Sequence, residues 1–222
     1  ILVIKDYRND KFITASGEML NLKDIKEHCF NILSGLYSLG GKTDFIIIEE
    51  LIQFTDAFKN YSYQGVPDAR IIVYRGMPVL AMMRLSTNAS KGKANLHQGA
   101  VGVGIDLKNG RALHAVCRDK AITIHPDTGA DLSKLVIPQW DEHLKIAYKV
   151  CEITNLQYVG SDIVLDKYRG ALLLELNARP GLAIQIANKI GLKPRLELVD
   201  KNIDKISRMN SSEKFNFICE NF

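Results

Sequence analysis

Residues 160–181 read GSDIVLDKYRGALLLELNARPG and carry the clearest structural signal in the chain. Apolar runs at 158–166 and 171–177 flank the polar residues 167–170, a pattern that predicts two antiparallel strands joined by a hairpin turn. Pairing outward from that turn places Asp162 directly opposite Glu175. Because side chains alternate along a strand, Asn177 is expected on the same face as Glu175.

This hairpin predicts a candidate metal site. Like charges that face each other across two strands are destabilising, so Asp162 and Glu175 need a reason to be paired. Two carboxylates and the amide of Asn177 are hard oxygen ligands of the kind that Mg²⁺ takes, with its other ligands supplied by phosphates and water. The alternative is a solvated outer face on a half-buried hairpin, and spacing alone leaves both interpretations open.

The end of the same stretch, NARPG at 177–181, predicts a turn that leads into a helix. A helix start offers free backbone N–H groups to an anion, and Arg179 adds the forked donors of a guanidinium. The alternative is a capping loop whose arginine is merely solvated.

The rest of the chain predicts further hairpins and a few helices. Apolar spacing indicates helices at 22–39, capped by Asn21 and ended by Gly40 and Gly41, and at 139–155. The expected strands and hairpins lie at 1–14, 45–52, 71–85 and 101–117, the polar loop between hairpins at 86–99, a short helix at 183–190, and weakly helical polar residues at the C-terminal end. Adjacent strands joined by hairpins predict an α+β fold with mainly antiparallel sheets and flanking helices.

Composition narrows the class of protein. The 222 residues suffice for one large domain or two small ones, and no apolar run approaches the roughly 20 residues of a membrane span. The 29 basic and 25 acidic residues are scattered, so no nucleic-acid groove is expected. Four cysteines without metal or redox spacing predict buried, reduced thiols and a cytoplasmic protein. They are Cys29, Cys117, Cys151 and Cys219.

Several motifs resemble the ATP-grasp superfamily. LELNARPG at 174–181, preceded by GSDI at 160–163, is similar to the metal-binding end of ATP-grasp ligases. DARI at 68–71, Arg84 and ANLHQG at 94–99 occur in the order and spacing of the branch that contains the ribosomal-protein glutamate ligases. The blocks that resemble proteins called alpha-L-glutamate ligase-like are 31–41, 63–76, 94–107, 125–129 and 174–188. The resemblance covers roughly residues 1–196 and is specific because five separate blocks agree.

The resemblance implies an ATP-grasp fold and a domain organisation. Residues 1–53 would be the remainder of the small lobe, residues 54–196 the large lobe with the metal site, and residues 197–222 a polar C-terminal tail. The chain opens on the apolar run ILVI, so we expect an N-terminally truncated module. A lysine and a glycine-rich phosphate-covering loop precede the corresponding strand in such ligases, and we expect weak nucleotide binding and poor ligation without them.

The resemblance also implies a nucleotide site. Glu49, Glu50 and Leu51 match the hinge whose backbone meets adenine, although many relatives have an aromatic residue where Glu50 stands; an ordinary strand end facing water is the alternative. Asp68 matches a position near the ribose, and a local ion pair with Arg70 is its alternative. The residues that match a nucleotide- and phosphate-contacting segment are Lys93, Ala94 and Asn95. His97 and Gln98 are candidates for substrate contact or for loop scaffolding.

The implied reaction is ATP-dependent ligation of a carboxylate to an amine through an acyl phosphate. Magnesium, as two ions, or Mn²⁺ in its place, would be held by Asp162, Glu175 and Asn177, and Arg84, Asn95 and Arg179 would act in catalysis. The substrates would be a small-molecule or peptide carboxylate, of glutamate type by the relatives' name, and an amine. The alternatives are a nucleotide- and magnesium-binding module without ligase activity and an interaction protein; the oligomeric state stays open.

Overall fold

The computed structural model describes residues 2–14, 16–53 and 55–222. Contacts along the chain separate two compact units, residues 1–52 and residues 53–222. Ile1, in the predicted first strand, and Phe54, where the predicted large lobe begins, lie outside the described residues. None of the helices in the described ranges is long and apolar enough to cross a bilayer.

The first unit combines a small antiparallel sheet with one helix. Its strands are β1 (Ile4–Arg8), β2 (Lys11–Thr14) and β3 (Met19–Leu20), in that order, followed by α1 (Leu22–Leu33). The hairpin expected at 1–14 forms. Its turn is Asn9 and Asp10, both with positive φ, the backbone that two-residue hairpin turns favour.

Helix α1 begins where the sequence predicts and ends earlier. The Asn21 side chain accepts from the backbone N–H groups of Lys23 and Asp24, and the Asp24 carboxylate accepts from the Asn21 backbone N–H, which completes a capping box. Gly35, with φ of +81°, follows the last turn. A left-handed residue at this position ends a helix, so Gly40 and Gly41 are not its terminators.

The strand predicted at 45–52 was wrong. Residues 43–53 have no regular secondary structure, and Phe45, Ile47 and Ile48 are 71%, 70% and 89% exposed. β-branched residues favour an extended backbone, but a strand exists only where a neighbouring strand accepts its hydrogen bonds. The three strands of this unit's sheet are drawn from residues 4–20, and none pairs with this segment.

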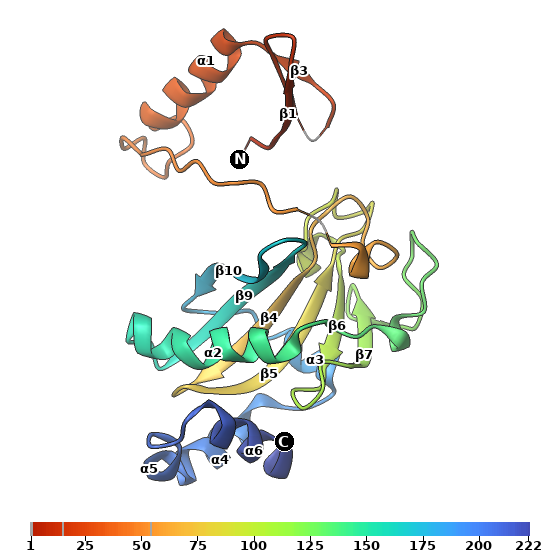
Figure 1. Ribbon diagram of the computed structural model, residues 1–222, viewed down its shortest axis with the longest axis vertical. Helices are drawn as coiled ribbons and strands as arrows, with labels where there is room; N and C mark the ends of the chain where they lie inside the picture. Colours follow the sequence, from red (N-terminus) through yellow and green to blue (C-terminus); the bar gives the residue numbers. More distant parts are fainter. Residues whose placement is uncertain (1, 15, 54) are drawn as a thin grey trace. The chain divides into compact units, whose positions relative to one another are not determined.

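The second unit is built on a seven-stranded antiparallel sheet (Figure 1). The strand order across the sheet is β10-β9-β4-β5-β6-β7-β8. The bounds are β4 (Asp68–Tyr74), β5 (Met77–Leu85), β6 (Val101–Ile105), β7 (Ala112–Cys117), β8 (Lys120–Ile122), β9 (Tyr158–Asp166) and β10 (Gly170–Asn177). Antiparallel sheets with flanking helices confirm the predicted α+β class; the short edge strand β8 was not predicted.

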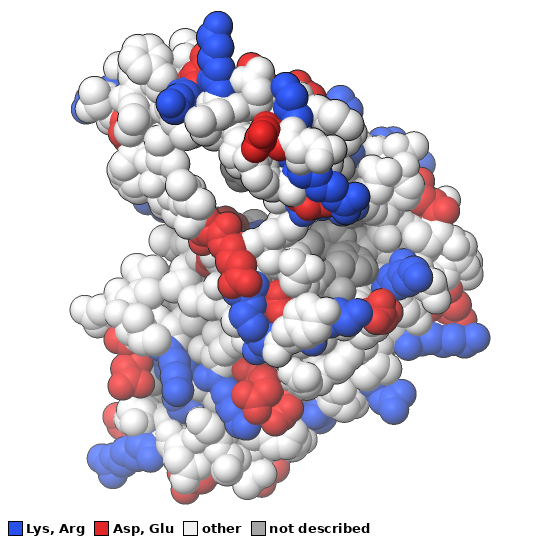
Figure 2. Space-filling view, turned by 45° about the horizontal axis from the view of Figure 1, so that its top comes forward, with Lys and Arg blue, Asp and Glu red and all other residues white. Residues whose placement is uncertain are grey.

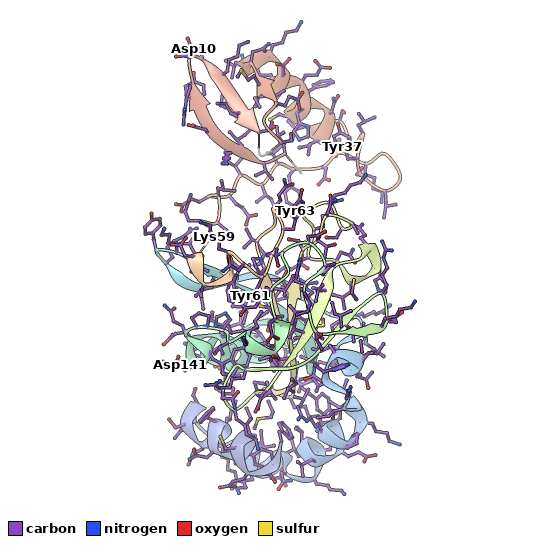
Figure 3. The ribbon with its side chains drawn as sticks, turned by 90° about the vertical axis from the view of Figure 1, so that its right-hand side faces the viewer. Asp10, Tyr37, Lys59, Tyr61, Tyr63 and Asp141 are labelled. Atoms are coloured by element: carbon purple, nitrogen blue, oxygen red, sulfur yellow. The ribbon has the colours of Figure 1, made fainter. Side chains whose placement is uncertain are left out.

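Helices cover both faces of this sheet. Helix α2 (Trp140–Thr154) crosses one face and buries Leu144, Ala147 and Val150 (Figure 1). Helix α3 (Ile184–Asn188) packs on β5, β6 and β7 from the other side. A Cβ atom at Gly104 would lie 2.2 Å from the Ala187 carbonyl oxygen, so only glycine permits this close approach. Tyr61, in the segment before β4, packs against the same core (Figure 3).

The C-terminal segment is helical and packed. Helices α4 (Leu192–Lys201), α5 (Ile203–Ile206) and α6 (Ser211–Asn221) follow α3, and Val199, Ile206 and Ile218 are fully buried. Residues 197–222 were expected to be a weakly helical polar tail, whereas they form well-defined helices whose apolar residues Val199, Ile206 and Ile218 pack into the core. The expectation of buried thiols also holds only for Cys151; Cys29 and Cys117 are half-buried and Cys219 is exposed.

Three short 3-10 helices complete the second unit: η1 (Asp56–Phe58), η2 (Leu96–Gln98) and η3 (Leu132–Lys134). On the face shown in Figure 2, acidic and basic side chains are interspersed.

In the β9–β10 hairpin Asp162 and Glu175 face each other as predicted, but the turn and the strand pairing that align them differ from the prediction. Glu175 pairs with Asp162 and Asn177 with Gly160. Near the turn, however, Gly170 pairs with Asp166, one residue tighter than predicted, and a β-bulge between Leu173 and Glu175 restores the alignment. The bulge, with Leu174 as its extra residue, was not predicted, and it compensates for the shorter turn.

Candidate functional site

Four neighbouring strands bring charged side chains together on one face of the large sheet. Arg70 on β4 pairs with Asp162 on β9, which pairs with Glu175 on β10. Two residues before Arg70 on β4, and therefore on the same face, Asp68 pairs with Arg84 on β5. Cross-strand partners share a face. Arg70 pairs with Met82 on β5, Met82 pairs with Gly104 on β6, and Gly104 lies against Ala187 of α3. The charged side chains therefore lie on the face of the sheet that α3 covers. We call these five charged residues, with Asn177, the carboxylate–arginine cluster.

Asp162 lies at the centre of the cluster. Its side chain is fully buried. Arg70 Nε and Nη2 donate to its Oδ1 and Oδ2 at 2.7 and 2.6 Å, and Arg84 Nη2 donates to Oδ2 at 2.6 Å. A carboxylate taken out of water is stable only when it is paired and hydrogen-bonded, and two arginines satisfy that condition here.

Asp68 and Arg84 form a second forked ion pair. Arg84 Nε and Nη2 donate to the two Asp68 oxygens at 2.5 and 2.8 Å, and the side chains are 5% and 13% exposed. The partner of Asp68 is therefore Arg84, whereas the sequence suggested Arg70. Arg84 bridges Asp68 and Asp162, which joins the position matched to the ribose and the position matched to the metal in one network.

Glu175 and Asn177 lie on the edge strand β10, beside Asp162. Asn177 Nδ2 is 3.0 Å from Glu175 Oε1 and 3.4 Å from Asp162 Oδ2, and Arg70 Nη2 is 3.9 Å from Glu175 Oε1. The Glu175 side chain is 57% exposed. The three side chains predicted to converge do so, with the buried Asp162 at the back and Glu175 open to solvent.

Electrostatics hold Asp162 ionised and make Asp68 the titrating group. Burial acts to raise the pKa of Asp162, but the hydrogen bonds from Arg70 and the charges of Arg84 and Arg70 outweigh it and hold the pKa below its ordinary value. Burial raises the pKa of Asp68 to about 6, with Arg84 opposing the rise. With all groups ionised, three carboxylates and two arginines leave the cluster one negative charge, which favours a cation.

The donors of the cluster fit magnesium in kind. In the parts of the chain that the structure describes, no three His, Cys, Asp or Glu side chains form a group that could hold a metal, so a third ligand has to be the Asn177 amide. The orientation of an amide is assigned from its hydrogen bonds, and turning it presents Oδ1 beside Glu175. Both Asp162 oxygens accept from arginines, so a metal must displace one of these donors.

Arg70 is the member of the cluster that the sequence did not single out as functional. The signal was present in the alternation of DAR at 68–70, which puts Asp68 and Arg70 on one face. What the sequence could not supply is the pairing of β4 with β9, two strands separated by some 90 residues of chain, which brings Arg70 to Asp162.

The predicted phosphate-contacting segment lies in a well-bonded loop between β5 and β6. Thr87 Oγ1 donates to the Gly99 carbonyl at 2.8 Å, and the Asn95 side chain caps η2 by accepting from the His97 backbone at 3.0 Å. Lys93 is exposed and Ala94 half-buried. Leu96 packs over Gly102, the cross-strand neighbour of Arg84, so the segment adjoins the cluster. The hydrogen bonds described above for the cluster do not involve this segment.

A buried histidine holds this loop in place. His125 is fully buried; its Nδ1 accepts from the Asp127 and Thr128 backbones, so Nε2 carries the proton toward the Ser86 carbonyl at 3.2 Å. Burial lowers its pKa, which keeps the ring neutral. The block at 125–129 that carried part of the resemblance is thus a structural support for the end of β5.

The other predicted residues form none of the hydrogen bonds described above for the cluster. Arg179 is exposed in the bend after β10, and the adjacent Pro180 packs against Gly160, where a Cβ atom would lie 2.7 Å from it. Helix α3, with five residues, is too short to supply an anion site by itself. Glu49, Glu50 and Leu51 belong to the first unit, in its segment without regular structure.

Comparisons with known proteins identify the family. The profile of the family described as sugar-transfer associated ATP-grasp matches residues 1–201. The chain therefore belongs to the sugar-transfer associated ATP-grasp family. The ATP-grasp superfamily was predicted correctly, whereas the glutamate-ligase branch stays a prediction.

Solved structures give a weaker likeness. The ATP-grasp ligase PsnB in complex with the precursor peptide PsnA2 and AMPPNP is 17% identical over 64% of this chain, with a TM-score of 0.32. PsnB with a phosphomimetic variant of the minimal precursor, Mg and ADP is 16% identical over 63%, with a TM-score of 0.33. The chain covers 33% of either of these PsnB chains. A comparison with curated proteins gives no match.

Proposed function

We propose that this protein is an ATP-dependent carboxylate–amine ligase that forms an amide through an acyl phosphate. One observation carries the proposal: the carboxylate–arginine cluster assembles metal-ligand and phosphate-neutralising residue types on one sheet face in a chain of the ATP-grasp family. In this reaction the substrate carboxylate attacks the γ-phosphate, ADP leaves, and the amine then displaces phosphate from the acyl phosphate.

The roles of the residues follow from their places. Asp162, Glu175 and Asn177 would hold magnesium, as two ions or with Mn²⁺ as a substitute, and the metal would supply neutralisation of phosphate charge. Arg84, and with it Arg70, would stabilise the charge that develops on the transferred phosphoryl group once the metal takes an Asp162 oxygen from them.

The remaining nucleotide contacts are proposed from the family pattern. Lys93, Ala94 and Asn95 would contact the phosphates from the loop beside Gly102, and Arg179 would meet a carboxylate-bearing substrate. Glu49 to Leu51 would meet adenine, with residues 1–53 as small lobe and 54–196 as large lobe. Asp68, which is buried against Arg84, is better suited to orienting Arg84 than to accepting a ribose hydroxyl.

No protein nucleophile is needed, because the substrate's own carboxylate attacks. The chain's contribution is positioning and preorganised charge. The acid would be a small molecule or a peptide of glutamate type, the second substrate an amine, and the site of action the cytoplasm.

A second candidate is a nucleotide- and magnesium-binding module without ligase activity. The observation that favours it is the double engagement of Asp162, whose oxygens both accept from arginines. If no ligand displaces those donors, Glu175 and Asn177 alone would bind the metal weakly. An interaction protein that uses the sheet as a scaffold is the third possibility, and it predicts no stabilisation by ATP.

The test compares Glu175→Gln with the parent protein and with Glu142→Gln, which removes a carboxylate of similar exposure on α2 (49% against 57%). We measure the magnesium-dependent rise in melting temperature with ADP, and ADP release from ATP with acid and amine. Losing a metal ligand should weaken Mg·ADP binding by at least about tenfold, while Glu142→Gln binds normally.

The three functions give different results. ADP release that requires both acid and amine and is lost in Glu175→Gln supports the ligase. Mg·ADP binding without such release supports the binding module. Absence of any nucleotide effect on the parent protein contradicts both, and unchanged turnover in Glu175→Gln contradicts the metal assignment.

A further inference from the structure

A small cavity lies on the same sheet face as the carboxylate–arginine cluster. Its volume is about 230 Å³, and it is lined by Leu96, His97, Val116, Arg118, Asp119 and Ala183. These residues come from η2, from strand β7, from the turn between β7 and β8, and from the residue before α3. None of them belongs to the cluster itself.

Strand pairing fixes the distance between this cavity and the cluster. Arg84 pairs with Gly102 on β6, and Gly102 pairs with Val116 on β7, so Val116 and Arg84 lie in one row. Neighbouring strands are about 4.8 Å apart, which puts the Val116 and Arg84 backbones roughly 10 Å from each other. Gly102 has no side chain, and Leu96 fills the space above it. Asp162 lies on β9, four strands from β7, so the cavity is a separate site roughly 19 Å from that carboxylate across the sheet.

The turn that forms the cavity wall has an unfavourable backbone for its residues. Arg118 and Asp119 have φ of 49° and 61°, between the paired residues Cys117 and Lys120. Such two-residue turns strongly favour Asn-Gly or Gly-Gly, and non-glycine residues in this region carry strain that is common at functional sites. The strained turn keeps an arginine and an aspartate where glycine would fit better.

The Arg118 guanidinium is held against the loop that carries His97. Its Nε and Nη2 lie 3.3 and 3.4 Å from where a Cβ atom of Gly99 would be. Gly99 is itself fixed, since its carbonyl accepts from Thr87 Oγ1 and from Cys117 Sγ. Within the described ranges, neither Arg118 nor Asp119 forms an ion pair, so both charges are available to a ligand.

Size and chemistry select the ligand. A volume of about 230 Å³ holds roughly seven or eight waters at about 30 Å³ each, enough for one amino acid and below the ~300 Å³ at which sites for larger ligands begin. Arg118 with His97 suits a carboxylate, Asp119 suits an ammonium group, and Leu96, Val116 and Ala183 form an apolar wall.

We propose that this cavity binds a free α-amino acid with an apolar side chain. Its carboxylate lies on Arg118 and His97 and its amino group beside Asp119. This binding does not depend on the proposed ligase function, and it is measured without nucleotide.

The experiment is a titration of the full chain with L-leucine, followed by NMR. Two probes of similar size, 4-methylpentanoate and isopentylamine, each lack one of the two charged groups. Arg118→Gly removes the guanidinium and relieves the turn, so this variant folds at least as well as the parent protein. Asp119→Asn removes the negative charge with a residue that tolerates this backbone. Arg111→Ala, an exposed arginine outside the cavity, is the matched control.

We expect leucine to bind more tightly than either probe, and Arg118→Gly to weaken it by about tenfold or more, the loss of a charge-assisted hydrogen bond. Asp119→Asn should reduce the preference over 4-methylpentanoate, and Arg111→Ala should bind as the parent protein does. Absence of leucine binding, or equal binding by Arg118→Gly, overturns the inference. Mg·ADP binding is measured in parallel: if it fails while leucine binds at this cavity, the proposed ligase fails and the amino-acid site stands.

Discussion

Replacing Arg70 by methionine tests whether the arginines stabilise the buried Asp162. The change removes two hydrogen bonds to a carboxylate with no exposed surface, while methionine preserves much of the apolar stem. Hydrogen bonds to charged groups contribute roughly 1.5–3 kcal/mol each, and breaking a buried ion pair costs about 3–5 kcal/mol. Arg84 still donates at 2.6 Å, so we expect a loss near the lower end, about 3 kcal/mol of unfolding free energy.

The assay is urea unfolding followed by tryptophan fluorescence. The chain has one tryptophan, Trp140, which lies in the second unit, is 7% exposed and donates to the Leu107 carbonyl. The signal therefore reports the unit that contains the cluster. Arg111→Met is the control for loss of an exposed arginine and should change stability by less than about 0.5 kcal/mol.

A double-mutant cycle with Asp162→Asn separates the pair from its surroundings. If Arg70 acts through Asp162, the double variant loses less than the two single variants together, with a coupling energy of about 2 kcal/mol. A loss below about 0.5 kcal/mol in Arg70→Met, or additive losses in the cycle, would refute the conclusion that these arginines hold Asp162 in place.

Two further predictions concern the same sheet face. Burial raises the pKa of Asp68 to about 6, so the folded protein binds this proton more tightly than the unfolded chain does, and the resulting stabilisation is full below about pH 4 and is lost as pH rises through 6. The stability of the parent protein relative to Asp68→Asn should therefore fall by up to about 3 kcal/mol between pH 4 and 7. A difference that stays constant with pH in urea titrations would contradict this. Gly104→Ala places a Cβ atom 2.2 Å from the Ala187 carbonyl oxygen and should lower the free energy of unfolding by at least about 2 kcal/mol. Gly181→Ala is the control, because its Cβ atom meets nothing within 4 Å, and it should leave stability unchanged. Equal melting temperatures for the two variants would refute the close packing of α3.

The sequence predicted most of the second unit because its hairpins are local. Strand β9 and helix α2 were predicted to within a residue at each end, since the apolar periodicity and the turn residues lie in the same short segments. The pairing of β4 with β9 and the packing of α3 on Gly104 were not predictable, because they join segments far apart in the chain. The failed strand at 45–52 has the same cause: its residues favour an extended backbone, and the missing partner is not a property of the segment.

In the candidate site, only the residues of the β9–β10 hairpin could be placed together from the sequence. Asp162, Glu175 and Asn177 follow from alternation within one hairpin. The contacts of the arginines could not be predicted. Arg84 was expected to act in catalysis, but its hydrogen bonds to both Asp68 and Asp162 depend on the pairing of β4 with β5 and with β9. The cavity beside Arg118 was not predicted. Arg-Asp is an unusual pair for a two-residue hairpin turn, so the sequence did not indicate the turn at 118–119 that forms the cavity wall.

The bulge at Leu174 makes the hairpin tolerant of changes in length. The turn between β9 and β10 and the Asp162–Glu175 pair stand on opposite sides of it, so an insertion or deletion of one residue in the turn can be absorbed by losing or enlarging the bulge. Related sequences can therefore gain or lose a residue between 167 and 174 while the two carboxylates keep their alignment. In an alignment of such sequences, a one-residue gap between 167 and 174 would leave the positions of Asp162 and Glu175 aligned with their counterparts.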